Sequence, residues 1–343
     1  MNISEIAKLA GVSKATVSRI LNNSEHVSDE TREKVLRIIH ENNYEPSSLA
    51  KGLTKNENST IGVIIPEIDN EFFSEVLSGI NEVVDQHNLS MICCDTNNNT
   101  NREAKALRTL SQQRVRGVII TPAEEGNEEL RKALQTLKIP IVVLDRHINN
   151  SLWDGVYYDN FNSAYAATEV LVKEGYTKIG VITGDLSLKI ARDRFEGFQG
   201  ALLNAGLQID KRYVWYGDFS VETAYQLSAQ MFKSGQYPEA ILTSNNRTTM
   251  GFLKAAREHS IRIGRDIALI GIDHVSLLND IGIPFSCVTR DSKEMGREAI
   301  NILLHRIKSN TITGRKITIV PYEIKLNGSE KRSTDCLIDK KPC

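Results

Sequence analysis

The chain has 343 residues, of which 41% are hydrophobic and 25% are charged, and its formal net charge is −1 at pH 7. This length allows two or three domains, and the nearly balanced charge excludes a polycation that coats nucleic acid. No apolar run is long enough to span a membrane and no leader precedes the first domain, so we expect a cytoplasmic protein without a membrane partner.

The composition of reactive residues argues against catalysis. The five cysteines form no Cys-x-x-Cys pair and the seven histidines are scattered, so we expect neither disulfides nor a metal site. The chain also lacks the Gly-x-Gly-x-x-Gly, Gly-x-x-x-x-Gly-Lys and Gly-x-Ser-x-Gly motifs of nucleotide-binding and hydrolytic α/β proteins. We therefore expect no cofactor, and we predict that the protein is not an enzyme.

Residues 4–22 predict two short helices joined by a tight turn. Gly11 suits the end of the first helix because it has no Cβ, and Ser13 is a good N-cap for the second. The outward face of the second helix is short, polar and basic, as in a helix that enters the major groove, although a helical hairpin without a ligand fits the spacing equally well. The predicted DNA contacts are Ser13, Lys14, Ala15, Thr16, Ser18, Arg19 and Asn22.

The segment that follows predicts a third helix and a hinge. The helix is expected over residues 28–43, with Ser28 as its N-cap. Residues 1–58 contain eight Lys or Arg and eight Asp or Glu, so the head has a small basic face rather than a basic surface. DNA binding should then be salt-sensitive and require two heads. Residues 46–59 predict a hinge with a helix too short to be stable alone, or a plain linker.

From residue 61 onward, buried strands alternate with amphipathic helices, in a run that restarts near residue 163. Continuous apolar strands linked by helices indicate parallel sheets that are covered on both faces. The predicted fold is therefore α/β: a three-helix helix-turn-helix head and a hinge, then two doubly wound parallel-sheet subdomains with a cleft between them. Ligands of such folds bind at the carboxyl ends of the strands.

Side chains suited to a sugar follow several of these strands. Asn70, Phe72 and Phe73 follow the first strand, Glu124 the third and Asp273 the last strand of the second run. Aromatic rings can stack on the apolar faces of a sugar, while amide and carboxylate groups can bond its hydroxyls. Adjacent phenylalanines are also common in hydrophobic cores, so Phe72 and Phe73 are either sugar contacts or core residues.

Three runs resemble the lactose-repressor (LacI/GalR) family of bacterial transcription regulators: Ala-Gly-Val-Ser-Lys-Ala-Thr-Val-Ser-Arg-Ile-Leu-Asn, Val-Ser-Asp-Glu-Thr-Arg-Glu-Lys-Val and Asn-Tyr-Glu-Pro. The resemblance covers nearly the whole chain. It implies a homodimer on a near-palindromic operator, with Leu53 wedged into the minor groove beside the small Ala50. It also implies a sensor similar to periplasmic sugar-binding proteins.

The expected domains are 1–45 (head), 46–59 (hinge), 60–158 with 289–317 (first subdomain), 159–288 with 318–329 (second subdomain) and 330–343 (polar tail).

The resemblance adds effector contacts at Arg192, Phe219 and Asn245, with Arg194 as the alternative to Arg192. It also places Asp145 and Arg146 near the cleft, as ligand contacts or as a structural ion pair. Arg290 stands where the family usually has glutamine. Its guanidinium favours an anionic ligand, or else pairs with Asp291 or Glu124 and leaves the ligand neutral. The complete expected effector set is Asn70, Phe72, Phe73, Glu124, Arg146, Arg192, Phe219, Asn245, Asp273 and Arg290.

The resemblance therefore implies a sequence-specific repressor whose operator binding is controlled by a small carbohydrate, either a monosaccharide or a sugar phosphate or acid. We expect induction, in which the effector releases the DNA. Corepression by a purine-like effector is the alternative, and a sugar-binding protein without DNA binding is a further one. Because coupling is reciprocal, DNA must change effector affinity by the same factor.

Overall fold

The computed structural model describes residues 1–21, 27–42, 59–309 and 314–331. The chain divides into two compact units, Met1–Ser59 and Thr60–Cys343. The expected contacts Asn22, Ala50 and Leu53 lie outside the described residues, as do hinge residues 46–58 and tail residues 332–343. No helix in the described parts combines the length and apolar character that crossing a bilayer requires.

Over residues 1–21 and 27–42, the first unit forms three helices around a small apolar core. They are α1 (Ile3–Ala10), α2 (Lys14–Leu21) and α3 (Asp29–Glu41). The predicted turn is confirmed: Gly11 ends α1 at φ 67°, and the Ser13 hydroxyl accepts a hydrogen bond from the Thr16 N–H at 3.1 Å. Ser28 is the N-cap residue of α3, as predicted, but its hydroxyl pairs with the Thr31 hydroxyl (2.8 Å) and not with the helix backbone.

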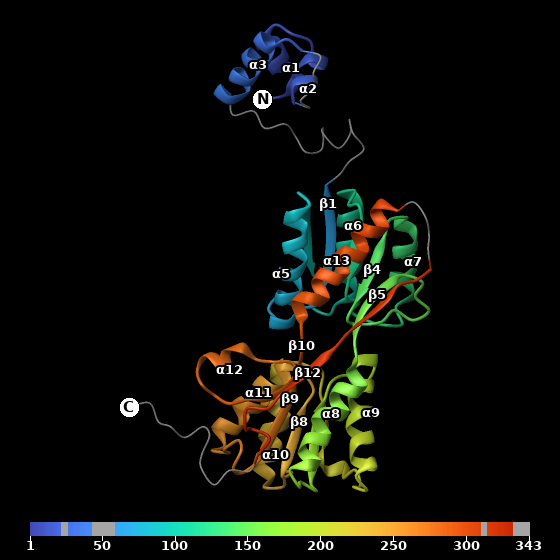
Figure 1. The fold of residues 1–343 in the computed structure, drawn as a ribbon. Helices are drawn as coiled ribbons and strands as arrows, with labels where there is room; N and C mark the ends of the chain where they lie inside the picture. Colours follow the sequence, from blue (N-terminus) through green and yellow to red (C-terminus); the bar gives the residue numbers. More distant parts are fainter. Residues whose placement is uncertain (22–26, 43–58, 310–313, 332–343) are drawn as a thin grey trace. The chain divides into compact units, whose positions relative to one another are not determined.

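The second unit begins with a six-stranded, entirely parallel sheet in the order β11-β5-β4-β3-β1-β2 (Figure 1). The strands are β1 (Thr60–Ile65), β2 (Ser90–Asp95), β3 (Val118–Ile120), β4 (Ile141–Leu144), β5 (Asp154–Tyr158) and β11 (Ile317–Val320). Helices α5 (Glu71–Gln86) and α13 (Ser292–Lys308) cover one face, and α6 (Thr100–Gln112) and α7 (Glu128–Leu137) cover the other. We call this part the first lobe.

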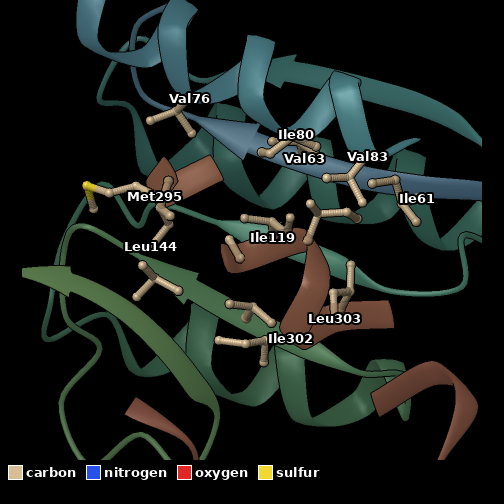
Figure 2. Packing of buried hydrophobic residues seen from close by; sticks show 14 of the residues in the cluster. Ile61, Val63, Val76, Ile80, Val83, Ile119, Leu144, Met295, Ile302 and Leu303 are labelled. Carbon is tan, nitrogen blue, oxygen red and sulfur yellow. The ribbon is translucent and has the colours of Figure 1, made fainter. Parts of the chain in front are cut away.

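The core of the first lobe depends on α13, which comes from far along the chain. Figure 2 shows Met295, Ile302 and Leu303 of α13 among side chains of the sheet, such as Ile119 and Leu144. These residues are fully or almost fully buried. Burial of such side chains supplies about 1.5–3 kcal/mol each, so the sheet needs α13 to complete its core.

The second lobe contains a sheet in the order β12-β10-β9-β8-β6-β7, in which only the β10–β12 pair is antiparallel among the described strands. Its strands are β6 (Ile179–Thr183), β7 (Val214–Tyr216), β8 (Ala240–Thr243), β9 (Ala268–Ile272), β10 (Ser286–Arg290) and β12 (Tyr322–Lys325). One face is covered by α8 (Asn160–Lys173) and α9 (Lys189–Asn204), and the other by α10 (Val221–Ser234) and α11 (Asn246–Glu258). A short helix, α12 (Ser276–Asp280), follows β9.

The chain passes between the lobes three times, after Tyr158, Arg290 and Val320. Arg290 still pairs with Tyr322 in the second sheet, and Val320 still pairs with Tyr158 in the first. The domain limits expected at 288 and 317 therefore fall inside β10 and β11. Strand pairing, which a single chain segment does not reveal, sets these limits.

Glycines allow the close packing of α5 against α13. A Cβ on Gly296 would lie 2.2 Å from the Val76 carbonyl oxygen. We expect Gly296→Ala to lower the free energy of unfolding by about 1–3 kcal/mol, because the two backbones must move apart. Urea denaturation measures this loss. Gly200→Ala in α9 is the matched control, since its nearest contact is 3.5 Å; an equal effect of both substitutions would contradict the packing explanation.

Candidate functional site

A cavity of about 390 Å³, including its open mouth, lies where the segments after the strands of both sheets meet. Its lining consists of Glu67, Asn70, Phe72, Phe73, Asp145, Arg146, Ile190, Arg194, Phe219, Asn245, Asn246, Asp273 and Arg290. Eight of the ten expected effector residues belong to this lining. The structure places the other two, Glu124 and Arg192, outside it.

Two of the lining amides are held at the starts of helices. Asn70 caps α5, where its side-chain oxygen accepts from the Phe72 N–H at 3.1 Å. Asn245 caps α11 and accepts from the Thr248 N–H at 2.8 Å. Each cap satisfies a backbone donor that would otherwise be unpaired, so the fold fixes both amides at the cavity wall.

Three lining residues have left-handed backbone conformations: Asp145 (φ 60°), Phe219 (φ 68°) and Asp273 (φ 64°). Asp145 and Asp273 directly follow β4 and β9, and Phe219 lies in the segment after β7. Side chains disfavour this conformation by about 1–3 kcal/mol, and such strain concentrates at functional sites. The cavity therefore contains backbone strain at three separate points of the second unit.

Arg290 lies at the centre of the charged groups. Its Nη1 donates to Asp145 at 2.7 Å and its Nε to Asp273 at 3.1 Å. The guanidinium also lies 3.8 Å from the centroid of the Phe72 ring. Burial opposes the charge of Arg290, but Asp273 and Asp145 raise its pKa above the usual value. Arg290 therefore pairs with neither Asp291 nor Glu124, the two partners that the sequence had suggested.

The pairing of Arg290 also affects the acid beside it. Burial disfavours the charged form of Asp145, but Arg290, Arg194 and Arg146 together hold its pKa below the usual range. Asp145 is thus ionised at neutral pH. The lining contains three carboxylates and three guanidinium groups, so its formal charges cancel.

Arg194 reaches the cavity, and Arg192 does not. Arg194 is buried and its Nε donates to Asn160 at 2.7 Å. Arg192 is 42% exposed and pairs with Glu125 at 2.9 Å, a contact between the two lobes. In the part of the chain that the structure describes, Arg192 therefore joins the lobes, while the alternative residue, Arg194, faces the cavity.

In the loop after β3, the buried acid is not the residue that was expected. Glu124 is exposed, whereas the next residue, Glu125, is buried. Glu125 accepts hydrogen bonds from Arg192 and from the Lys189 backbone N–H. No periodic pattern in this short loop distinguishes the two neighbours.

The expected DNA-reading surface in the first unit is polar and largely exposed. Ser13, Lys14, Ala15 and Arg19 are exposed, while Thr16 and Ser18 are half-buried. No acidic residue lies in α2, whose last turn carries Arg19. The helix thus presents two cations and several hydroxyls on one surface, which suits contacts with phosphates and base edges.

Residues 2–47 match the family described as bacterial regulatory proteins, lacI family. Residues 58–329 match the periplasmic binding proteins and sugar binding domain of LacI family. The chain belongs to the LacI family of bacterial regulatory proteins. LacI-family members are DNA-binding transcriptional repressors with a ligand-binding domain, and the predicted family, fold class and general function are confirmed.

Several LacI-family relatives match over almost their whole length. The chain is 31% identical to the ribose operon repressor of Escherichia coli (strain K12), over 92% of this chain and 96% of that repressor. It is 30% identical to the HTH-type transcriptional repressor PurR of Pasteurella multocida (strain Pm70), over 90% and 92%. The structure of the lac repressor dimer bound to operator and the anti-inducer ONPF matches with a TM-score of 0.81 and 26% identity, over 96% and 99%.

Behind the cavity of this LacI-family protein, Glu103 of α6 is a buried acid that the sequence did not reveal. Its Oε1 accepts from the Ala123 N–H at 2.9 Å, in the loop that also contacts Arg146. Burial raises the pKa of Glu103 to about 7, against the effects of this hydrogen bond and of Arg146. The glutamate therefore takes up a proton when the protein folds at mildly acidic pH.

This raised pKa predicts a pH-dependent stability. Between pH 4.5 and 7 the folded state binds the Glu103 proton more tightly than the unfolded state, so stability falls as the pH rises through this window. We expect Glu103→Gln to reduce that fall by on the order of 2–3 kcal/mol. Urea unfolding at several pH values measures this change in the free energy of unfolding, and substitution of the exposed Glu196 (Glu196→Gln) is the control. Parallel profiles for wild type and Glu103→Gln would contradict the prediction.

Proposed function

We propose that the cavity binds a neutral monosaccharide of pentose or hexose size, and that this effector controls operator binding by the head. The observation that carries the proposal is the pairing of Arg290 with Asp145 and Asp273. The lining holds three carboxylates and three guanidinium groups, so its formal charges cancel, and Arg290 is already paired with two of those carboxylates. A neutral polyhydroxyl ligand is the class that such a lining accommodates.

Unused hydrogen-bonding groups support a hydroxylated ligand. Nη2 of Arg194 and Nε of Arg146 are buried without a hydrogen-bond partner among the described residues. A buried donor left unpaired costs about 1–3 kcal/mol. Sugar hydroxyls would satisfy such donors, and the carboxylates of Asp145 and Asp273 offer acceptors nearby.

Aromatic rings supply the apolar contact that a sugar ring needs. Phe72 and Phe73 pack edge to face, with centroids 4.8 Å apart, and Phe219 lines another part of the cavity. All three rings are almost fully buried. Rings at the cavity wall can contact the C–H faces of a sugar while the polar groups bond its rim.

The curated relatives support two effector classes. One is named for a ribose operon and another is named PurR. The chain is almost equally similar to both, so identity does not choose between them. The charge-balanced lining of the cavity favours the sugar. In this proposal the protein acts as a regulator and not as an enzyme.

The head supplies the DNA contacts in this proposal. Lys14, Ala15, Thr16, Ser18 and Arg19 would read one half of a near-palindromic operator, with a second copy of the chain on the other half. The related lac repressor was solved as a dimer bound to operator, which supports this assembly. The balanced charge of the head makes two-headed binding necessary for useful affinity.

A thermal-shift screen tests the effector class. The purified chain is heated with neutral pentoses and hexoses, sugar phosphates, sugar acids and purines, since a ligand of the native state raises the melting temperature. We expect a response to a neutral monosaccharide such as D-ribose. A response confined to phosphates, acids or purines would overturn the proposal.

A second experiment determines how the effector acts. Operator fragments are selected from genomic DNA by the full chain, and their affinity is measured with and without the sugar that passes the screen. Induction predicts weaker DNA binding with sugar, and DNA must weaken sugar binding by the same factor. Tighter DNA binding would establish corepression instead, and no selected DNA would refute the repressor assignment for this chain.

A further inference from the structure

Beside the cavity, but outside its lining, the side chains of two glutamates and a histidine meet on the seam between the lobes. Glu71 and Glu75 are four residues apart on α5, so they lie on the same side of this helix. His274 comes from the other lobe, immediately after β9. One donor atom of each of the three side chains lies within 4.8 Å of the others.

The distances fit the coordination sphere of a small divalent metal. His274 Nε2 lies 3.1 Å from Glu75 Oε1 and 3.6 Å from Glu71 Oε1. Metal–ligand bonds of about 2.1 Å in a tetrahedral site place neighbouring ligand atoms about 3.4 Å apart. These two distances bracket this value, and the two glutamates offer oxygen atoms within 4.8 Å of one another, so the three side chains are close enough to share one ion.

The surroundings of His274 orient its ring for this role. Its Nδ1 lies 3.1 Å from the Thr289 hydroxyl oxygen, and that hydroxyl can donate in turn to the Arg290 carbonyl oxygen at 3.5 Å. Donation from Nδ1 to this hydroxyl leaves Nε2, which here contacts Glu75, as the ring nitrogen that would coordinate a metal. A partner at the second ring nitrogen is the usual support of a metal-binding histidine.

The charge of the cluster also favours a bound cation. Two carboxylates and a neutral imidazole carry a formal charge of −2, and all three side chains are only about one quarter to one third exposed. A divalent ion neutralises this charge, whereas one proton on the imidazole leaves half of it. Mixed imidazole and carboxylate ligands suit Zn²⁺ and related transition metals better than Mg²⁺.

We infer that Glu71, Glu75 and His274 form a binding site for a divalent transition metal, with zinc as the best fit, which ties the two lobes together beside the cavity. The sequence predicted no metal site because His274 is 199 residues from Glu75, so no motif spacing connects them. The ligands come from both lobes. Metal binding therefore stabilises the arrangement in which α5 and the β9–α12 segment are adjacent.

Calorimetry with the full chain tests this inference. The protein is stripped with EDTA, exchanged into chelator-free buffer at neutral pH with a reductant, and titrated with ZnCl₂, MnCl₂ or MgCl₂. We expect one strong zinc site per chain, weaker manganese binding and the weakest binding for magnesium. His274→Gln and Glu75→Gln should each weaken zinc binding at least tenfold, by loss of one ligand.

The controls separate this site from other zinc ligands in the chain. His305→Gln alters an exposed histidine on α13 and should bind zinc as the wild type does. Glu75→Gln keeps an oxygen that can accept from His274, so it guards against misfolding of the His274 variant; metal-free melting curves of both variants check the fold. Absence of zinc binding would overturn the inference, since His274 would then bind only a proton. Equal zinc binding by the wild type and both variants would also overturn it, since the zinc would then be bound elsewhere, for example by the cysteines.

Discussion

Arg194→Met is expected to weaken monosaccharide binding about 100-fold, while Arg192→Met remains within a few-fold of the wild type. A hydrogen bond to a charged group contributes about 1.5–3 kcal/mol, and 1.4 kcal/mol corresponds to a factor of ten. Arg194 lines the cavity and has a buried Nη2 without a partner among the described residues. Arg192 lies outside the lining and contacts Glu125.

Calorimetric titration with D-ribose, or with the sugar that passes the screen, measures both affinities. Arg194 also donates to Asn160 and to the Ser244 carbonyl oxygen, so its loss affects the fold as well as the ligand. Arg194→Lys keeps the charge and serves as a gentler second variant. If Arg192→Met lost more affinity than both Arg194 variants, the assignment of Arg194 to the ligand would fail.

Arg290→Met is expected to lower the free energy of unfolding at pH 7 by about 3–5 kcal/mol, because it leaves two buried carboxylates without their cation. Asp145 and Asp273 both bond this guanidinium in the wild type, and all three side chains are less than one tenth exposed. Denaturant unfolding of the purified chain measures the loss. Adding Asp145→Asn to the variant should recover part of it, since one uncompensated charge is removed.

The sign of the pH dependence distinguishes this explanation from simple loss of packing. In the wild type the lowered pKa of Asp145 contributes stability that is present above the unfolded pKa and lost as the pH falls through the folded one. Without Arg290, only Arg194 and Arg146 oppose the effect of burial on Asp145, so its pKa rises and the variant loses less stability in acid than the wild type does. The deficit of Arg290→Met should therefore shrink from pH 7 to pH 4.5; a deficit that stays constant would indicate packing alone.

The sequence predicted those features that depend on neighbours along the chain. The turn at Gly11 and the cap at Ser13 need only a few adjacent residues, and both were correct. The alternation of strands and helices also follows from local hydrophobic patterns. Most of the lining could be expected for a related reason, because it follows the ends of predicted strands.

The remaining features depend on contacts between distant residues or on the rotation of a helix. The partners of Arg290 are separated from it by 17 and 145 residues, so no local pattern reveals them. Arg194 did have a usable signal. It precedes Phe198 by four residues and Ala201 by seven, which places it on the buried stripe of α9, whereas Arg192 lies off this stripe.

The triple passage of the chain between the lobes has a consequence for biosynthesis. Synthesis of the first-lobe strands up to β5 is complete at residue 158, but synthesis of α13 and β11 is complete only at residue 320. At about 5–20 residues per second, the nascent first lobe waits roughly 10–30 s with one sheet face lacking α13. Meanwhile the second lobe, apart from β12 and the C-terminal segment, is already synthesised. The lobe nearer the N-terminus must therefore finish folding late, and its uncovered sheet is where a chaperone would bind during translation.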